Sequence, residues 1–163
     1  MLTNMRAIAP IDLSKVWPEI RHEVAEIEAP DGFIPEDAYA MCKSAQASLF
    51  FLEVEGKRVG WMICRLLGAD LHIWMVRAET GYDVLHTFRG ELMQLARSAN
   101  ATKLTYGSTR KAWAKVAPDH GFSIRMVVYE CPVEPLHVCG NGASIPNIAI
   151  DDGAPDNDKH ATH

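Results

Sequence analysis

Residues that can bind a metal ion gather in two places near the C-terminal end of the sequence. Cys131, His137 and Cys139 are close enough along the chain to share one ion, but no CxxC pair or second ligand cluster accompanies them. The acidic run at 151–158 superficially resembles a calcium loop, yet it lacks the ligand spacing and the terminal Glu of such a loop. We therefore predict no metal site and a solvated acidic tail.

The sequence also shows no recognisable set of side chains for nucleophilic catalysis. The spacing of Ser, Cys, His and Asp supports neither a Ser-His-Asp nor a Cys-His arrangement. Cys42 and Cys64 lie within apolar segments, and the cysteines are too scattered to form a disulfide framework. They are typical of reduced thiols, which favours a cytoplasmic location.

Carboxylates dominate the N-terminal part of the chain. Such a surface would favour a cationic amine over an anionic ligand, with a solvated helix face as the alternative interpretation. The carboxylates are Asp12, Glu19, Glu23, Glu26, Glu28, Asp31, Glu36 and Asp37, and the cations among them are Lys15, Arg21 and Lys43.

The composition is that of an ordinary globular protein. The 163 residues suffice for one domain, and 48% of them are hydrophobic and 23% charged. A formal net charge of -5 argues against nucleic acid as a partner, because phosphate contacts need clustered Lys and Arg. The longest apolar stretches are too short to cross a bilayer, and Met1–Pro10 lacks a signal-peptide core. We expect a soluble protein that binds neither nucleic acid nor membranes.

Hydrophobic spacing predicts two helices before the first long strand. Apolar residues recur every three or four positions from Leu13 to Ile27, and Pro18 should start or bend this helix. Pro35 suits the first position of a second, short helix. Thr3–Ile8 is a candidate strand ahead of both.

Strands and helices then alternate. Ser48–Glu55 and Arg58–Leu67 are apolar runs joined by Gly56-Lys57, which predicts a β-hairpin, and Leu71–Val76 continues the meander. Helical spacing returns from about Gly81 to Ser98. Three elements follow: a strand at Lys103–Tyr106, a short helix at Arg110–Ala117 and a final strand at Ser123–Cys131.

This order predicts an α/β fold with a single domain. Its central mixed sheet is flanked by helices, because a hairpin followed by strand-helix-strand units needs crossover connections. The domain should span residues 1–132, and residues 133–163 should form an extended acidic tail that adds little to the core. The expected core comprises Leu49, Phe51, Val59, Trp61, Ile63, Ile73, Leu92, Leu104 and Val127.

The order of elements, with the segment Glu53–Trp61 and the later His120-Gly121-Phe122, resembles the GNAT-type N-acetyltransferase superfamily over roughly residues 2–130. The resemblance implies a GNAT-like domain in which two N-terminal helices bracket the acceptor site. The helix after the central strand would receive the pyrophosphate of acetyl-CoA. Acetyl-CoA is then the implied cofactor, and a small-molecule or protein amine is the implied acceptor.

The expected phosphate loop departs from the superfamily pattern. In the signature Arg/Gln-x-x-Gly-x-Gly/Ala, glycines let backbone N–H groups approach a pyrophosphate. The equivalent turn here is residues 80–86, where Gly81 is the one glycine and Asp83 adds a negative charge. We therefore expect a degenerate loop with weak or absent acetyl-CoA binding, and a helix start that suits Asp83.

The resemblance also implies roles for particular side chains. Attack of an amine on a thioester needs a base for the amine and an acid for the leaving thiolate. Glu79 and His72 are the candidate bases, and Tyr106 is the candidate acid because the usual Tyr position holds Ala117. Each of the three also fits an ordinary structural position. The residues that the resemblance places near acetyl-CoA are Val76, Arg77, Gly81, Tyr82 and Arg110, with Arg89 and Lys111 as further cations.

Two classes of function stay open at this point. The first is an acyl-CoA-dependent N-acyltransferase acting on an unidentified amine. The second is a catalytically inactive GNAT-fold scaffold, such as a phage virion or accessory assembly protein, whose tail from about Val133 contacts a partner protein. Titration with acetyl-CoA distinguishes the two.

Overall fold

The computed structural model describes residues 1–27, 32–108, 110–129 and 131–133. The chain divides into two units, Met1–Met126 and Val127–His163, and every helix and strand below belongs to the first. The domain boundary expected after residue 132 stays a prediction. In the described ranges, no helix has the length and apolar character needed to span a membrane.

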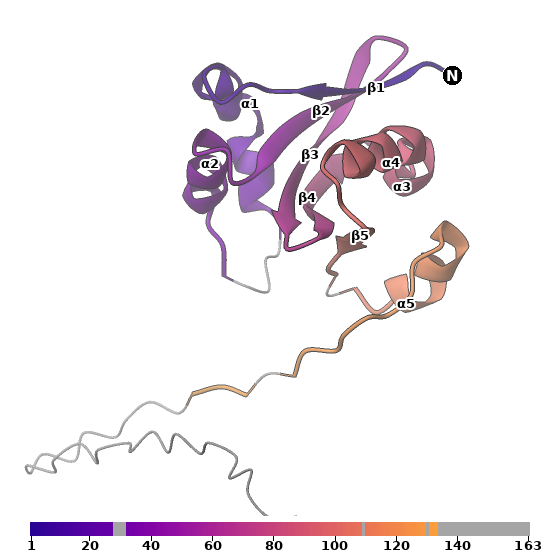
Figure 1. The fold of residues 1–163 in the computed structure, drawn as a ribbon. Coiled ribbons are helices and arrows are strands. Elements are labelled where there is room, and N and C mark those ends of the chain that lie inside the picture. The colour runs from indigo at the N-terminus through magenta and orange to yellow at the C-terminus, as the bar shows by residue number, and fades with distance from the viewer. Residues whose placement is uncertain (28–31, 109, 130, 134–163) are drawn as a thin grey trace, which may run out of the picture. The chain divides into compact units, whose positions relative to one another are not determined.

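Five strands form one mixed sheet, in the same order as along the chain (Figure 1). The first four strands pair antiparallel with one another. The fifth strand runs parallel to the fourth, as the strand-helix-strand order predicts. The strands are β1 (Thr3–Ala7), β2 (Ser48–Val54), β3 (Lys57–Leu67), β4 (Asp70–Ala78) and β5 (Lys103–Tyr106).

Helices cover both faces of this sheet. Side chains alternate along β2, so Leu49 and Phe51 pack under one pair of helices while Phe50 and Leu52 pack under the other. The first pair is α1 (Leu13–Ala25) and α2 (Pro35–Lys43), and the second is α3 (Val84–Thr87) and α4 (Arg89–Ser98). The predicted α/β class with a central mixed sheet is confirmed.

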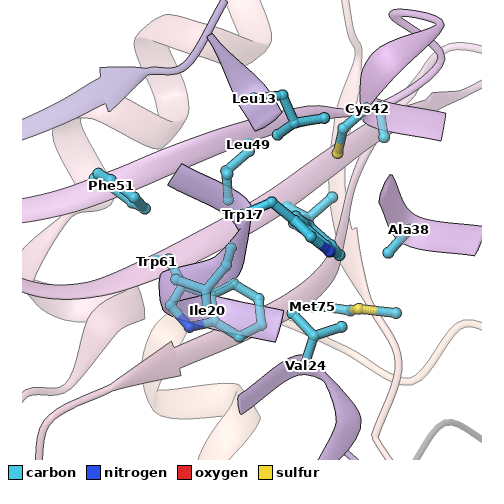
Figure 2. Close-up of a cluster of buried hydrophobic side chains, with 12 residues drawn as sticks. Leu13, Trp17, Ile20, Val24, Ala38, Cys42, Leu49, Phe51, Trp61 and Met75 are labelled. Carbon is cyan, nitrogen blue, oxygen red and sulfur yellow. The ribbon is translucent and has the colours of Figure 1, made fainter. Parts of the chain in front are cut away.

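The cluster of buried side chains under α1 and α2 is drawn in Figure 2. The apolar stripe of α1, including Trp17 and Ile20, meets Trp61 and Met75 of the sheet. α1 begins at Leu13 and runs past Pro18, which lies on its exposed side; of the two effects expected of Pro18, a helix start is therefore excluded, and a bend stays a prediction. A proline inside a helix removes one intrahelical hydrogen bond, but Pro18 lies on the exposed side, so the apolar stripe of α1 stays intact.

The predicted helix at 81–98 is two helices. α3 and α4 meet at Phe88, whose backbone is non-helical and whose side chain is fully buried in the cluster under these helices. The first of them starts at Val84 because the Asp83 carboxylate accepts a hydrogen bond from the His86 N–H at 3.1 Å. The expectation that Asp83 suits the helix start is confirmed.

The last predicted elements differ from the structure. A short helix, α5 (Trp113–Val116), continues into a 3-10 turn, η1 (Ala117–His120), rather than stopping before Pro118. The final strand expected at Ser123–Cys131 is absent from the described residues of that segment. Val127, which was expected in the core, is 60% exposed and belongs to the second unit, whereas Leu104 packs half-buried against the cluster under α3 and α4. An apolar run reports strand propensity, but a strand also needs a backbone partner.

Candidate functional site

β4 and β5 pair along only the first half of β4. Their parallel pairing starts at Asp70 and Lys103 and ends at Ile73 and Tyr106, whereas β4 continues to Ala78. In the described part of the chain, the second half of β4 pairs on one side only, with β3. Backbone N–H and C=O groups on the other side are therefore open to a ligand that carries amide groups.

A β-bulge at Trp74 marks the place where pairing with β5 ends. Ile63 faces Met75 and Cys64 faces Ile73, so Trp74 has no opposite residue in β3. Trp74 and Met75 both pack toward the cluster under α1 and α2, whereas Ile73 belongs to the cluster on the opposite face. The extra residue gives β4 the local bend with which bulges redirect strands.

Aromatic and cationic side chains pack around the bulge. The ring centroid of Trp74 lies 4.4 Å from that of Phe33, in an edge-to-face arrangement. The Arg65 guanidinium lies 4.6 Å from the centroid of the Trp74 ring, within the range of a cation–π contact. The bulged residue is thus held in place by two neighbours from different parts of the chain.

A cleft of about 340 Å³ lies where β3, β4 and α1 come together. Glu79 follows β4 into this cleft, and its backbone N–H donates to the Val59 carbonyl at 2.8 Å. The Glu79 carboxylate is exposed, and it makes no ion pair with the described residues. The lining residues are Glu23, Arg58, Val59, Gly60, Trp61, Arg77, Ala78, Glu79 and Thr80.

The carboxylates on α1 and directly after it, beside this cleft, are already paired. Glu19 accepts a hydrogen bond from Arg58 at 2.6 Å, and Glu26 accepts one from Arg77 at 2.5 Å. Glu23 lies 3.9 Å from Arg77. The N-terminal acidic surface expected for a cation is therefore partly neutralised by arginines of β3 and β4, and Arg77 faces α1 rather than a phosphate.

The turn between β4 and α3 holds the residues expected near the pyrophosphate. Gly81 has a φ of 102°, which an L side chain rarely adopts, and Tyr82 packs half-buried against the cluster under α3 and α4. Asp83, besides capping α3, has a carboxylate oxygen 3.3 Å from Nε2 of His120. A carboxylate thus lies in the turn that was expected to hold the pyrophosphate.

A second cleft, of about 410 Å³, separates α3 and α4 from η1. Arg89 lies in this cleft, and its Nη1 donates to the His120 carbonyl oxygen at 2.7 Å. Arg110 is exposed, and its backbone N–H donates to Ser108 Oγ at 3.1 Å. The lining residues are Leu85, His86, Arg89, Pro118, Asp119, His120 and Gly121.

The three candidate catalytic side chains do not meet. His72 lies on the face of β4 that carries α1 and α2, and its Nδ1 is 2.9 Å from Thr105 Oγ1. Tyr106 lies on the opposite face, where its ring packs 5.2 Å from that of Trp113. Burial raises the pKa of Tyr106 above its usual value, which keeps the phenol protonated and able to donate. Glu79 is separate from both, at the far end of β4.

Two features of the site were missed from the sequence. Leu71, Ile73 and Met75 alternate without a break, so no change of phase marks the bulge between them. His120 was noted for its neighbours in the chain, but its proximity to Asp83 is a long-range contact. Among the described residues, no three His, Cys, Asp and Glu side chains are placed to hold a metal; His137 and Cys139 lie outside those residues.

Comparison with known proteins identifies the fold. No known family profile and no curated protein sequence matches this chain. A structure of AAC(6')-Iy with a bisubstrate analogue matches it with a TM-score of 0.56 at 11% identity, covering 82% of this chain and 100% of that one. A ribosomal-protein-alanine N-acetyltransferase from Brucella melitensis biovar Abortus 2308 matches with a TM-score of 0.56 at 12% identity, covering 82% and 99%. A Trypanosoma brucei acetyltransferase matches with a TM-score of 0.53 at 17% identity, covering 81% and 100%.

The chain has a GNAT-like fold. The resemblance expected over residues 2–130 is thereby confirmed for the fold. AAC(6')-Iy has also been solved in complex with CoA, and that structure matches with a TM-score of 0.54 at 10% identity. Within the GNAT-like fold of this chain, the open half of β4 leads directly through Val76 into the turn that holds Gly81 and Asp83.

Proposed function

We propose that this protein is an acyl-CoA-dependent N-acyltransferase that acetylates an amine. The open half of β4 beyond the bulge at Trp74 is the observation that carries this proposal. Acetyl-CoA contains amide groups in its pantetheine arm, and amides can pair with a free strand edge. The backbone of residues 74–78, with Val76, Gly81 and Tyr82, would hold the cofactor.

The phosphate end of the cofactor fits this chain less well. Asp83 would lie beside the pyrophosphate as a like charge, and its carboxylate already satisfies one N–H at the start of α3. Arg77 is engaged with α1, so Arg89 and Arg110 are the cations left to offset that charge. Binding should therefore be weak, with a dissociation constant of about 1 mM.

Glu79 is the residue we assign to the acceptor amine. Its exposed carboxylate in the cleft can remove the proton of the attacking ammonium group. The neutral amine nitrogen would then bond to the carbonyl carbon of the acetyl group that acetyl-CoA supplies, the C–S bond would break, and the nitrogen would release its second proton to solvent as the thiolate leaves. Tyr106, whose phenol is protonated at neutral pH, is the candidate donor to that thiolate. An acetylated amine and CoA are the products.

Asp83 gives a direct test of cofactor binding. Replacing it with Gly should tighten acetyl-CoA binding about tenfold, because the like charge is removed and a glycine lets the backbone approach the pyrophosphate more closely. Asp83→Asn is the matched variant: it removes the charge and keeps a side-chain cap for α3. Titration calorimetry measures all three proteins. No binding by any of them at millimolar acetyl-CoA would overturn the proposal, and micromolar binding by the wild type would contradict a degenerate loop.

Acetyl transfer tests the role of Glu79. The solved relatives include aminoglycoside and ribosomal-protein-alanine acetyltransferases, so the probes are an aminoglycoside, a polyamine and a peptide with an N-terminal alanine. Glu79→Gln should slow release of free CoA thiol by about 100-fold or more, the usual loss on removing a general base. Glu55→Gln, in the exposed turn between β2 and β3, is the control and should leave the rate unchanged, because a glutamine oxygen can still accept the hydrogen bond from the Leu2 N–H. Equal rates for the two variants would remove Glu79 from the reaction.

A second function is a scaffold that has lost catalysis. The capping of α3 by Asp83, its contact with His120, and the separation of His72 from Tyr106 on opposite faces favour it. The comparisons lend no support to a phage or virion origin. A chain that binds acetyl-CoA only at millimolar concentration and acetylates none of the three amine probes would be assigned to this class.

A further inference from the structure

His120 and Asp83 bring an imidazole and a carboxylate together at the turn that leads into α3. Nε2 of His120 lies 3.3 Å from a carboxylate oxygen of Asp83. The side chain of His120 is 10% exposed, whereas that of Asp83 is 51% exposed. The pair thus joins a nearly buried imidazole to a carboxylate that still faces solvent. We call residues 80–86, which contain Asp83, the phosphate turn.

Contacts from three elements hold His120 in place. Its carbonyl oxygen accepts a hydrogen bond from Arg89 Nη1 of α4 at 2.7 Å. The next residue, Gly121, has a φ of 78° and donates its backbone N–H to the Pro118 carbonyl of η1 at 2.9 Å. The Trp113 ring of α5 has its centroid 6.4 Å from that of the imidazole. The imidazole is therefore held at the phosphate turn.

Asp83 is held in the same turn by both of its carboxylate oxygens. One oxygen accepts a hydrogen bond from the His86 N–H at 3.1 Å and so caps α3, while the other faces His120. Turning the carboxylate away would leave the start of α3 without its cap. The negative charge therefore stays in the phosphate turn, and a cation must offset it there before an anionic ligand can bind well.

The second cleft holds two histidines whose charge can change around neutral pH. Its charged or titratable lining residues are His86, Arg89, Asp119 and His120. Arginine and aspartate keep their charges between about pH 5 and pH 8, whereas histidine changes charge in that range. Within the described part of the chain, Asp83 forms one ion pair, and its partner is His120 rather than His86.

We propose that His120 is a positioning residue that acts through Asp83 and sets the charge of the phosphate turn; this inference rests on the proposed function. When the imidazole is neutral, Asp83 presents its full negative charge to the pyrophosphate of acetyl-CoA. When the imidazole is protonated, the pair carries no net charge, and the repulsion that weakens binding is offset. Acetyl-CoA should therefore bind more tightly as the pH falls and His120 gains its proton.

Titration calorimetry with acetyl-CoA at about pH 6 and about pH 8 tests this inference. The dissociation constant of the wild type should be about tenfold lower at the lower pH. The ribose phosphate of the cofactor also changes charge in this range, so a variant must supply the reference. His120→Gln is that variant, because glutamine can donate a hydrogen bond to Asp83 but cannot take up a proton. It should show only the smaller change that belongs to the cofactor.

His86→Gln is the matched control. It removes the other histidine of the second cleft and keeps the backbone N–H that bonds to Asp83. This variant should therefore retain the tenfold pH dependence of the wild type. Thermal melts followed by circular dichroism at both pH values establish that each variant folds.

The outcomes separate this inference from the proposed function. Equal pH dependence in the wild type and His120→Gln would overturn the inference, as would loss of the dependence in His86→Gln and not in His120→Gln. Either result would leave acetyl-CoA binding in place, and with it the proposed function. If the wild type bound no acetyl-CoA at millimolar concentration at either pH, both the proposed function and this inference would be overturned.

Discussion

Replacing Phe88 by Ala is expected to lower the free energy of unfolding by about 3–5 kcal/mol. Phe88 is 0% exposed and sits at the junction of α3 and α4, where it packs with Leu85 and Leu92 against the sheet. Its removal leaves a cavity at the place that aligns both helices. Urea unfolding followed by circular dichroism measures the loss.

Phe88→Leu is the matched variant for this prediction. Leucine retains most of the apolar volume, so the free energy of unfolding should fall by about 1 kcal/mol only. If the alanine variant lost no more than the leucine variant, Phe88 would not be the contact that joins α3 and α4 to the sheet.

The second large effect is expected at Gly60, on the wall of the cleft that holds Glu79. A Cβ at this position would lie 2.3 Å from the Arg77 carbonyl oxygen and 2.8 Å from Ala78 Cα, both backbone atoms. Gly60→Ala must therefore push β3 away from β4, and we expect a loss of about 1–3 kcal/mol in the free energy of unfolding. The backbone N–H of Glu79 donates a hydrogen bond to the Val59 carbonyl, next to Gly60 in the chain. The same change should therefore displace Glu79, the candidate base.

Gly90 is the control for Gly60. It lies in α4, and a Cβ there would meet no atom within 4 Å. Gly90→Ala should raise the free energy of unfolding by about 1 kcal/mol, because alanine favours the helix. The two glycine variants should thus move the urea midpoint in opposite directions. A Gly60→Ala midpoint equal to or above that of the wild type would show that the close contact between β3 and β4 is relieved without cost.

Sequence patterns within a few residues correctly predicted a strand, a helix start and a hairpin turn. The strand at Lys103–Tyr106 has the predicted bounds, and Pro35 begins α2 because a proline without an N–H suits the first helical position. The hairpin of β2 and β3 turns at Gly56, where φ is 76°. Spacing and turn chemistry act over a few residues, so a sequence displays them directly.

Features that depend on distant residues were not predicted. The pairing of Glu19 and Glu26 with Arg58 and Arg77 joins a helix to strands much later in the chain, so an acidic segment appeared free. The expected strand at Ser123–Cys131 has the right residues but no backbone partner in the described sheet. Candidate site residues were chosen from family positions, and their separation onto two faces follows from strand register.

The bulge in β4 has a consequence for how insertions and deletions would act on this protein. Trp74 and Met75 face the same side of the sheet, so deleting Trp74 would leave every other side chain of β4 on its present face. The sheet would keep its two faces and lose the irregularity at which pairing of β4 with β5 ends, together with the contacts of Trp74 with Phe33 and Arg65. A Trp74 deletion should therefore fold, as judged by circular dichroism, and lose its calorimetric signal with acetyl-CoA. The single extra residue at the bulge of β4 would then be the difference between a sheet in which β4 pairs on both sides and a sheet in which half of β4 has a free edge for a ligand.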